Sequence, residues 1–468
     1  MVTESRTYDA VIVGAGQSGV PLSTALARAG WKVALVERQY VGGSCINWGC
    51  TPTKTMVASA RVAHVARRAE TYGVHAGPVK VNMAAVRRRK AEIVEGFRQN
   101  LQRRIREAEG VDLVMGEARF TGHKALAVSL NDGGSLHLSA DKILLNTGGR
   151  PHVPHLPGLE DVPFLDSTSV MELEELPEHL IILGGGYVGL EFGQMFCRFG
   201  SQVTIVQRSG QLLSEEDPDV AEAVAQILRE DGIQVLLNAE AREARQENGT
   251  ISLHVQAPDG QQVLRGSHLL VATGREPNTD ALNLAAGGVA VDRRGYIVAD
   301  ERLETNVPGI YALGDVKGGP AFTHVSYDDY RILCANLLEG GERTVHDRPV
   351  PYVVFTDPQL GRVGLTERQA REAGRRFRVA RMPMSWVARA VEVDETRGLM
   401  KALVDAETGQ ILGAAILGYQ GGEIMAMIQV AMMGGLPYTA LRDAVFTHPT
   451  LSEALNSLFS SLEDEGSG

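Results

Sequence analysis

Apolar and polar positions first form a clear pattern at residues 8–38, YDAVIVGAGQSGVPLSTALARAGWKVALVER. The apolar run Ala10–Val13 predicts a buried strand, because strands covered on both faces read as continuous apolar runs. A glycine-rich turn and a helical stretch follow, and a second apolar run ends at Glu37. Strand, helix and strand in this order predict two parallel strands joined by a crossover helix.

The turn of this unit carries Gly14, Gly16 and Gly19. Gly14 permits the tight turn, Gly16 lets a pyrophosphate approach the backbone, and Gly19 lets the helix pack close to the sheet. The N-terminus of the helix offers unpaired N–H groups to the phosphates. Glu37 lies 18 residues after Gly19, where it can accept hydrogen bonds from an adenosine ribose. The unit therefore predicts a dinucleotide site, and a plain structural turn is the alternative.

The same pattern recurs at residues 179–210, with Gly184, Gly186 and Gly189 in the turn. Gln207 now stands where the ribose carboxylate is expected, and Arg208 follows it. A carboxylate would repel a 2′-phosphate, whereas a neutral residue beside an arginine tolerates or binds one. The second site therefore favours NADPH over NADH, unless Arg208 only points to solvent. Two such sites imply electron transfer between two nucleotides, and the first, with its acid, suits FAD.

Length, charge and hydropathy narrow the class of protein. A chain of 468 residues predicts two to four domains. A net charge of −11 argues against nucleic-acid binding, and the basic run 87–90, within a helix expected over residues 82–108, is interpreted as a solvated helix face. No apolar run reaches the ~18 residues of a membrane span. The N-terminal stretch lacks the features of a secretory signal, so we expect a cytoplasmic protein.

Two of the four cysteines, Cys45 and Cys50, lie in one stretch, GGSCINWGCTPTK (42–54), before a predicted helix. A metal site, a structural disulfide and a redox pair are the alternatives. A reducing cytoplasm disfavours the structural disulfide, and no further Cys or His stands at a spacing typical of zinc. A helix N-terminus and the nearby Lys54 favour a thiolate. Cys197 and Cys334 lie singly in apolar surroundings and are expected to be inert.

Together these motifs resemble the FAD-dependent pyridine-nucleotide disulfide oxidoreductases, which include dihydrolipoyl dehydrogenase, glutathione reductase and mercuric reductase. The cysteine stretch is similar to the redox-active disulfide motif of that family. Further similar segments follow in the same order: ILLNTGGRP (143–151), LLVATGREPN (269–278), TNVPGIYALGDV (305–316), FTDPQLGRVGLTE (355–367) and FTHPTLSE (446–453). The resemblance covers residues 8–458, nearly the whole chain.

The resemblance implies an α/β fold with two doubly wound dinucleotide-binding domains, as in glutathione reductase, and a C-terminal α+β dimerisation domain. It implies an FAD domain at 1–150 and 281–345, an NAD(P) domain at 151–280 and an interface domain at 346–468. The active unit would be a homodimer whose subunits share the active site. The residues after Leu462 are acidic and small, and are expected to be disordered.

The resemblance also assigns the two cofactor sites. The FAD site would comprise residues of the first unit, the cysteine stretch and two later turns: Gly14, Gly16, Gly19, Glu37, Gly43, Ser44, Lys54, Thr147, Gly148, Gly314 and Asp315. Within it, Asp315 would bind the ribityl chain. The NAD(P) site would comprise residues of the second unit and one later glycine: Gly184, Gly186, Tyr187, Gly189, Glu191, Gln207, Arg208 and Gly274. Tyr187 would be the aromatic gate that covers the flavin.

By the same resemblance, hydride passes from the nicotinamide to the flavin, which then reduces the disulfide. Cys50 would face the flavin, and Cys45 would be the exposed sulfur that meets the substrate. His448, oriented by Glu453, would be the acid–base that the other subunit supplies. Lys54 and Glu191 would form an ion pair near the reacting rings. Trp48, between the cysteines, is expected to pack within the loop.

Departures from the named relatives narrow the substrate. Mercuric reductases usually carry a C-terminal cysteine pair, and this chain has no cysteine after Cys334. Gln207 and Thr447 argue against dihydrolipoyl dehydrogenase. Residues 321–333 and 387–401 look most like mercuric-reductase-like proteins without the metal relay, and like cupric reductases. We therefore expect a thiol-reactive metal ion, bound at Cys45 and Cys50 as substrate, or a small disulfide to be the electron acceptor, and no structural metal.

The alternatives are a dihydrolipoyl dehydrogenase, and a diaphorase or transhydrogenase that bypasses the cysteines. A redox-sensing subunit without turnover is a third, and the intact set of cysteines, His448 and Glu453 argues against it.

Overall fold

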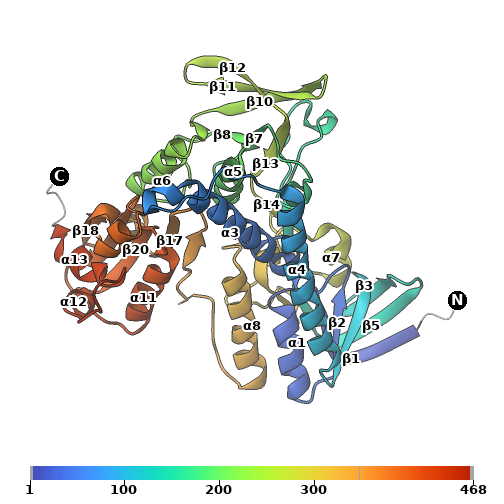
Figure 1. Ribbon diagram of the computed structural model, residues 1–468. Coiled ribbons are helices and arrows are strands. Elements are labelled where there is room, and N and C mark those ends of the chain that lie inside the picture. The colour runs from blue at the N-terminus through green and yellow to red at the C-terminus, as the bar shows by residue number, and fades with distance from the viewer. Residues whose placement is uncertain (1–3, 347, 464–468) are drawn as a thin grey trace. The chain divides into compact units, whose positions relative to one another are not determined.

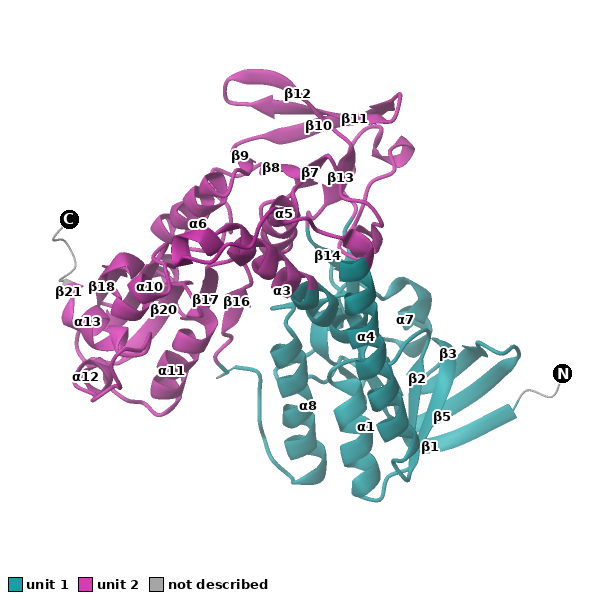
Figure 2. Cartoon of the chain, in the orientation of Figure 1, with its two compact units in different colours: residues 1–55, 85–152, 274–348 teal, residues 56–84, 153–273, 349–468 magenta. Residues whose placement is uncertain are grey.

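The computed structural model describes residues 4–346 and 348–463, and its chain divides into two compact units (Figures 1 and 2). Unit 1 comprises residues 1–55, 85–152 and 274–348, and unit 2 comprises residues 56–84, 153–273 and 349–468. The chain leaves unit 1 within helix α3 (Cys50–Arg67) and returns within helix α4 (Met83–Arg106). The flavin, nicotinamide and interface domains with the boundaries given above stay predictions.

Unit 1 is built on one six-stranded sheet (Figure 2). Its strands are β1 (Glu4–Val13), β2 (Val33–Glu37), β3 (Val111–Gly122), β4 (Ala125–Leu130), β5 (Ser135–Leu145) and β15 (Ile310–Ala312). Strand β1 pairs in parallel with both β2 and β5, β2 pairs in parallel with β3, and β15 pairs in parallel with β5. The predicted strand, helix and strand are β1, α1 (Gly19–Arg28) and β2.

Side chains of β1 alternate between two hydrophobic clusters. Ala10 and Ile12 pack with α1 and with helix α8 (Thr323–Leu338), whereas Val11 and Val13 pack against the other face of the sheet. Helices α1 and α8 run side by side on the face of the sheet that carries Ala10 and Ile12 (Figure 1). This double burial explains why β1 reads as a continuous apolar run.

The first half of unit 2 repeats the parallel arrangement. Its four-stranded sheet has the order β13-β7-β8-β9, with strands β7 (His179–Leu183), β8 (Gln202–Val206), β9 (Gln234–Leu236) and β13 (His268–Val271). Helix α5 (Tyr187–Phe199) joins β7 to β8, and α6 (Pro218–Glu230) joins β8 to β9. A separate antiparallel sheet contains β10 (Glu240–Glu247), β11 (Thr250–Ala257) and β12 (Gly260–Gly266).

The C-terminal part of unit 2 is an antiparallel six-stranded sheet with helices. Its order is β16-β17-β20-β19-β18-β21, from β16 (Tyr352–Val354), β17 (Gln359–Gly364), β18 (Phe377–Pro383), β19 (Leu399–Asp405), β20 (Ile411–Gly418) and β21 (Leu462–Glu463). The helices include α9 (Glu367–Glu372), α11 (Gly421–Met433), α12 (Tyr438–Arg442) and α13 (Ala454–Ser460). The sheet of unit 1, parallel except for the antiparallel strand β4, the parallel sheet of unit 2 and this α+β part together confirm the predicted fold class.

The basic run at residues 87–90 differs in part from the expectation. Residues 87–90 do lie within one long helix, α4, but Lys90 is only 4% exposed, so the run is not wholly a solvated face. Four consecutive residues turn through all sides of a helix, and one of them therefore faces inward.

The C-terminal tail is expected to be disordered after Leu462. Glu463 pairs in β21, and residues 464–468 of the tail lie outside the described residues. No helix within the described ranges has the length and apolar character needed to span a bilayer.

Candidate functional site

The first glycine turn closes tightly on the sheet of unit 1. Gly14 has a φ of +106°, and a Cβ there would lie 2.3 Å from the carbonyl oxygen of Asn146. A Cβ on Gly19 would lie 2.2 Å from the carbonyl oxygen of Gly14. Beside them, the Ala15 N–H donates to Glu37 Oε2 at 2.9 Å. The turn has the close backbone packing that a pyrophosphate requires, with a carboxylate at the end of the next strand, and so fits the adenosine half of FAD.

Two strand-turn segments, which end at Pro151 and at Asn278, pair with each other through short strands. Strand β6 (Gly149–Pro151) pairs with β14 (Arg275–Pro277). Thr147 Oγ1 donates to the Asn278 carbonyl at 2.8 Å, and the Asn278 side chain donates back to the Thr147 carbonyl at 2.9 Å. Gly148 and Gly274, the two turn glycines, have φ values of +67° and +129°. Gly274 is the first residue of the third segment of unit 1, and its role at the nicotinamide site stays a prediction.

A buried acidic turn follows β15. Gly314 and Asp315 begin a 3₁₀ turn (Gly314–Lys317), and the Gly314 N–H donates to Asp329 Oδ2 at 2.8 Å. Burial raises the pKa of Asp315 above its usual value, while Arg275, whose Nε lies 3.7 Å from Asp315 Oδ2, opposes this rise. An acidic side chain in such a turn can accept a hydrogen bond from a hydroxyl, as the predicted role of Asp315 at a ribityl chain requires. No motif of the sequence points to Asp329.

The cysteine stretch packs directly on the first glycine turn. A short helix, α2 (Gly43–Asn47), carries Cys45, and Cys50 is the first residue of α3. Gly43 has a φ of +61°, and a Cβ there would lie 2.8 Å from the Cα of Gly16. Any larger residue at position 43 would push the cysteine stretch away from the turn. Trp48 lies against Tyr40, with ring centroids 6.2 Å apart, so it packs within this loop as expected.

The thiols of Cys45 and Cys50 lie together and form no disulfide with each other. A hydrogen bond with Cys50, followed by burial, raises the pKa of Cys45, and the charge of Lys54 opposes the rise. Thr323 Oγ1 lies 3.3 Å from Cys50 Sγ. Cys50 is exposed and Cys45 is half-buried, and the roles of the two sulfurs toward flavin and substrate stay predictions. Cys197 and Cys334 are half-buried, and burial raises the pKa of both thiols.

The second glycine turn, in unit 2, reproduces the geometry of the first. Gly184 has a φ of +118°, and a Cβ there would lie 2.3 Å from the carbonyl oxygen of Ala272. A Cβ on Gly189 would lie 2.2 Å from the Gly184 carbonyl oxygen, whereas one on Gly186 would meet nothing within 4 Å. The Gly185 N–H donates to Gln207 Oε1 at 2.9 Å. Gln207 therefore occupies the place of Glu37, with a neutral amide in place of a carboxylate.

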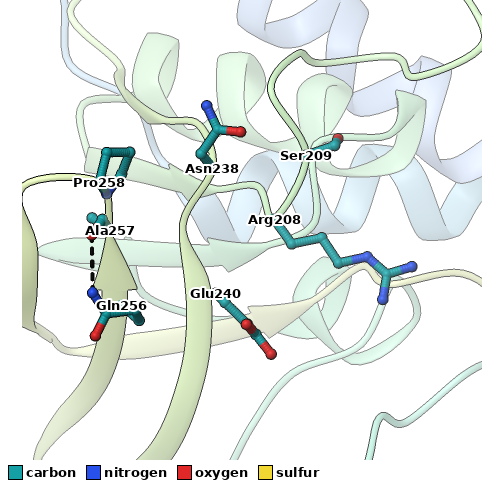
Figure 3. Close-up of a pocket in the computed structure, with 7 residues that line it drawn as sticks. All are labelled: Arg208, Ser209, Asn238, Glu240, Gln256, Ala257 and Pro258. Carbon is teal, nitrogen blue, oxygen red and sulfur yellow. Dashed lines mark hydrogen bonds between the residues drawn. The ribbon is translucent and has the colours of Figure 1, made fainter.

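A pocket in unit 2 is lined in part by the two residues that follow Gln207, Arg208 and Ser209 (Figure 3). Arg208 is exposed there and brings a positive charge, while Glu240 brings a negative one. The Gln207 amide nitrogen donates to Ser209 Oγ, which in turn donates to the Gln211 carbonyl. The residues that line the pocket come from the end of β8, the start of β10 and the end of β11: Arg208, Ser209, Asn238, Glu240, Gln256, Ala257 and Pro258. Of these residues, the sequence predicts only Arg208 as part of a site.

The residues expected nearest the reacting rings lie in different units. Glu191, on α5 in unit 2, is buried and accepts a hydrogen bond from the Phe355 N–H at 2.9 Å. Tyr187 is the half-buried first residue of the same helix. Lys54 belongs to unit 1, on the first turns of α3. The Lys54–Glu191 ion pair and the gating role of Tyr187 stay predictions.

His448 and Glu453 lie together in the C-terminal part of unit 2. The Nδ1 atom of His448 lies 2.9 and 3.0 Å from the two carboxylate oxygens of Glu453. The His448 side chain is 72% exposed, whereas that of Glu453 is 20% exposed. The carboxylate therefore orients the ring through Nδ1, while Nε2 takes no part in this contact.

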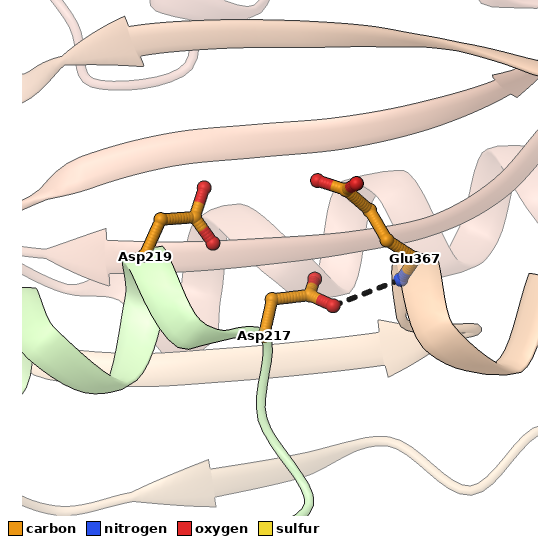
Figure 4. Close-up of side chains that lie close together, drawn as sticks. All are labelled: Asp217, Asp219 and Glu367. Atoms are coloured by element: carbon orange, nitrogen blue, oxygen red, sulfur yellow. Dashed lines mark hydrogen bonds between the residues drawn. The ribbon is translucent and has the colours of Figure 1, made fainter. Parts of the chain in front are cut away.

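Three carboxylates elsewhere in unit 2 could suggest a cation site (Figure 4). Asp217, Asp219 and Glu367 have ligand atoms within 4.8 Å of one another. However, Lys401 Nζ lies 3.2, 2.8 and 2.6 Å from these three carboxylates in turn. The Lys401 side chain is 2% exposed, so its ammonium already supplies the cation. We interpret this group as a structural ion-pair cluster.

Comparisons with known proteins agree along nearly the whole chain. Residues 8–329 match the family described as pyridine nucleotide-disulphide oxidoreductase, and residues 350–459 match its dimerisation domain. The chain is 41% identical over 457 residues to a probable pyridine nucleotide-disulfide oxidoreductase, RclA, of Escherichia coli, covering 97% of this chain and 99% of the relative. It is 38% identical over 456 residues to a mercuric reductase of Streptomyces lividans, covering 97% and 96%.

A dihydrolipoyl dehydrogenase of Haloferax volcanii is 34% identical over 451 residues, covering 95% of this chain and 94% of the relative. Among solved structures, the Cu(II) complex of the HOCl-induced flavoprotein disulfide reductase RclA from Escherichia coli superposes with a TM-score of 0.89. That match has 41% identity and covers 97% of this chain and 99% of the other.

Proposed function

Because this chain belongs to the pyridine nucleotide-disulphide oxidoreductase family, we propose that it is a flavoprotein reductase acting through Cys45 and Cys50. Electrons would come from NADPH or NADH and leave to a thiol-reactive metal ion, with Cu(II) as the first candidate. The observation that carries this proposal is the pair of thiols, hydrogen-bonded to each other on a loop that packs against Gly16 of the first glycine turn. The relative whose structure is titled a Cu(II) complex supports the choice of copper.

The residues of unit 1 fit FAD. The turn Gly14–Gly19 would hold the pyrophosphate, Glu37 the adenosine ribose and Asp315 the ribityl chain. The remaining contacts would come from the residues at the cysteine stretch and the strand-turn segment: Gly43, Ser44, Lys54, Thr147, Gly148 and Gly314. When bound, FAD supplies an acceptor for the hydride of NAD(P)H and a donor of two electrons. The tight packing at Gly14, Gly19 and Gly43 supports this assignment, since a side chain at any of these positions would displace the backbone.

The cysteines would take up and release the electrons. A Cys45–Cys50 disulfide that gains two electrons and two protons becomes two thiols. Two Cu(II) ions that each take one electron become two Cu(I) ions, while the sulfur–sulfur bond forms again and two protons leave. Thiolates are soft ligands that suit Cu(I). His448, oriented by Glu453, would accept a proton from the thiol that meets the metal ion.

We further propose that the protein prefers NADPH. At the end of β8, Gln207 presents an amide where the FAD unit has the Glu37 carboxylate, so a 2′-phosphate would meet no negative charge there. The exposed Arg208 can approach such a phosphate. Glu240 in the same pocket works against it, which limits the expected preference to a moderate one.

We also propose a cytoplasmic homodimer with a shared active site. The match to the dimerisation domain supports the dimer. Large apolar side chains are exposed on the C-terminal part of unit 2, among them Val430, Met433, Leu436 and Val445. A second copy would bury such side chains.

An anaerobic titration of the purified protein with NADPH, and separately with NADH, tests the proposal. We expect a broad long-wavelength absorbance band after two electrons, and release of Cu(I) to a chelator when Cu(II) is added. Cys50→Ser should abolish both, whereas Cys197→Ser, which removes a half-buried thiol elsewhere, should preserve both. Flavin bleaching without the band, equal in wild type and Cys50→Ser, would instead favour a diaphorase or transhydrogenase. Reduction of NAD⁺ by dihydrolipoamide, with no action on Cu(II), would favour a dihydrolipoyl dehydrogenase.

A further inference from the structure

Helix α8 of unit 1 presents three polar side chains, Thr323, Ser326 and Asp329, at a spacing of three residues. Residues three apart lie on nearly the same face of a helix, about 4.5 Å apart along its axis. Ser326 and Asp329 are buried, with exposed fractions of 8% and 0%. Polar groups at buried positions of a helix cost free energy unless they are paired, so their partners indicate what they do.

The first of the three touches the redox pair. Thr323 is the first residue of α8, and its hydroxyl lies 3.3 Å from the sulfur of Cys50. The same hydroxyl also lowers the pKa of Cys45 through a hydrogen bond, against the stronger effects that raise it. A hydroxyl that donates to a sulfur favours the thiolate over the thiol. Thr323 therefore lies where it can stabilise a negative charge on either sulfur.

The second side chain holds the start of α1. Ser326 Oγ lies 2.5 Å from the hydroxyl of Ser18, and Ser18 Oγ lies 2.7 Å from the Ser326 carbonyl oxygen. Ser18 is fully buried and directly precedes α1, between Gly16 and Gly19 of the first glycine turn. Ser326 thus fixes the helix end that would face the pyrophosphate.

The third side chain holds the acidic turn. Asp329 accepts hydrogen bonds from the Gly314 N–H at 2.8 Å and from an Arg348 guanidinium nitrogen at 2.7 Å, and its Oδ2 lies 3.3 Å from Lys317 Nζ. A Cβ on Gly314 would lie 2.8 Å from Ser326 Oγ, so the turn and the helix face are in close contact. Asp329 thereby fixes the turn that presents Asp315.

We propose that Thr323, Ser326 and Asp329 are positioning residues, through which α8 sets the places of the flavin anchors and of Cys50 relative to one another. The proposal rests on the proposed function, since it assumes that FAD binds these anchors. One rigid helix holds three loops that are far apart in sequence, at residues 14–19, 45–50 and 314–317. A helix that served packing alone would need only the apolar face that includes Val325, Ile332 and Leu333.

The first test measures FAD binding to the Asp329→Asn variant, which keeps the shape of the side chain and removes its charge. We expect the dissociation constant for FAD, measured by quenching of flavin fluorescence on titration into apoprotein, to rise at least about 10-fold. Asp300→Asn is the matched control, because Asp300 also accepts backbone N–H groups in unit 1 but lies in an exposed turn. That control should leave the constant unchanged. Equal constants for wild type and a folded Asp329→Asn variant would overturn the positioning role.

The second test measures the pH dependence of Cys50 alkylation by iodoacetamide in the Cys45→Ser background, in the apoprotein. Thr323→Val removes the hydroxyl at nearly constant volume, and we expect it to shift the midpoint upward by about one pH unit. Thr323→Ser should restore the wild-type midpoint. An unchanged midpoint in Thr323→Val would overturn the role of this residue. If the FAD and alkylation results are as expected but the protein does not reduce Cu(II), the proposed substrate is wrong and the positioning role stands. If the wild-type protein binds no FAD, both proposals are wrong.

Discussion

At the scale of single residues, the two glycine turns differ in one informative position. Glu37 and Gln207 each accept a hydrogen bond at 2.9 Å from the N–H of the residue after the first turn glycine. The backbone frame is therefore the same, and the side chain alone changes the charge offered to a bound ribose. A carboxylate accepts hydrogen bonds from ribose hydroxyls, whereas a neutral amide does not repel a 2′-phosphate that Arg208 can bind.

This difference predicts that charge at positions 207 and 208 controls the choice of nicotinamide. Arg208→Ala should raise the KM for NADPH about 10-fold, because a charge-assisted hydrogen bond to the phosphate is lost, and should leave the KM for NADH nearly unchanged. Gln207→Glu should lower kcat/KM for NADPH by a similar factor through repulsion of the phosphate. Initial rates over a range of both nucleotides measure this. Equal effects of Arg208→Ala on NADPH and NADH would mean that Arg208 does not contact the 2′-phosphate.

His448 and Glu453 lead to a prediction about the second half of the reaction. Removing the carboxylate by Glu453→Gln leaves the imidazole less firmly oriented, and removing the ring by His448→Ala removes the proton acceptor. We expect turnover with the electron acceptor to fall about 10-fold and at least about 100-fold, respectively. Rapid-mixing experiments should find the rate of reduction by NADPH unchanged in both variants.

The chain offers a matched control for this pair. His75 and Glu70 form another exposed histidine–carboxylate pair in unit 2, 3.7 Å apart. Glu70→Gln should leave turnover at the wild-type level. If Glu453→Gln slowed reduction by NADPH as strongly as turnover, the acid–base role at the thiols would be wrong.

At the scale of secondary-structure elements, the ion-pair cluster joins α6 to the antiparallel sheet of unit 2. Lys401 on β19 is bound by Asp217, Asp219 and Glu367, and Arg362 on β17 is bound by Glu216. Burial alone would raise the pKa of Glu367, but Lys401, with Arg371 and Arg381, lowers it to about 2. The folded protein therefore stabilises the ionised form of this carboxyl more than the unfolded chain does.

The cluster predicts both a mutational and an acid effect on stability. Lys401→Met should lower the free energy of unfolding by about 3–5 kcal/mol, since it leaves carboxylates buried without their cation. The stability contributed by ionised Glu367 is present above its ordinary pKa of 4.5 and is lost as the pH falls towards about 2. The difference in denaturation midpoint between wild type and Glu367→Gln should therefore shrink over that range. A difference that is constant from neutral pH to pH 2 would contradict this account.

An exposed ion pair supplies the control for the cluster. Arg376 and Glu407 lie 3.6 Å apart with side chains 79% and 73% exposed. Exposed pairs contribute little, because water and salt screen the attraction. Arg376→Ala should leave the denaturation midpoint unchanged.

The elements also show which features can be predicted from the sequence. Both glycine turns, the helix over residues 82–108 and the cysteine stretch depend on neighbours close in the chain, and their patterns identify them. Three contacts of the site could not be predicted from the sequence: Asp329 with Gly314, Thr147 with Asn278 and Thr323 with Cys50. Their partners lie 15, 131 and 273 residues apart, so no local pattern shows that they meet. The burial of Lys90 could not be predicted, because its three basic neighbours in sequence, Arg87–Arg89, mask the helix period.

At the scale of the whole molecule, the match to a dimerisation domain predicts that a second copy completes the protein. Val430 and Met433, on and at the end of α11, are 68% and 69% exposed in the single chain. Such large apolar side chains favour association. His448, whose side chain is 72% exposed, belongs to the same unit.

Negative charges introduced on this apolar surface should therefore abolish turnover and leave the binding of FAD intact. We expect Val430→Glu with Met433→Glu to give a monomer in sedimentation velocity, because burying two carboxylates in an interface is unfavourable. The monomer should retain FAD, since the FAD anchors all belong to unit 1, but should lose turnover with the acceptor if His448 acts on the partner's cysteines. Val263→Glu is the control, because Val263 is also exposed, at 45%, but lies on β12 outside the C-terminal sheet. A monomer with full turnover would show that one subunit carries the complete active site, and His448 would then act within its own chain or not at all.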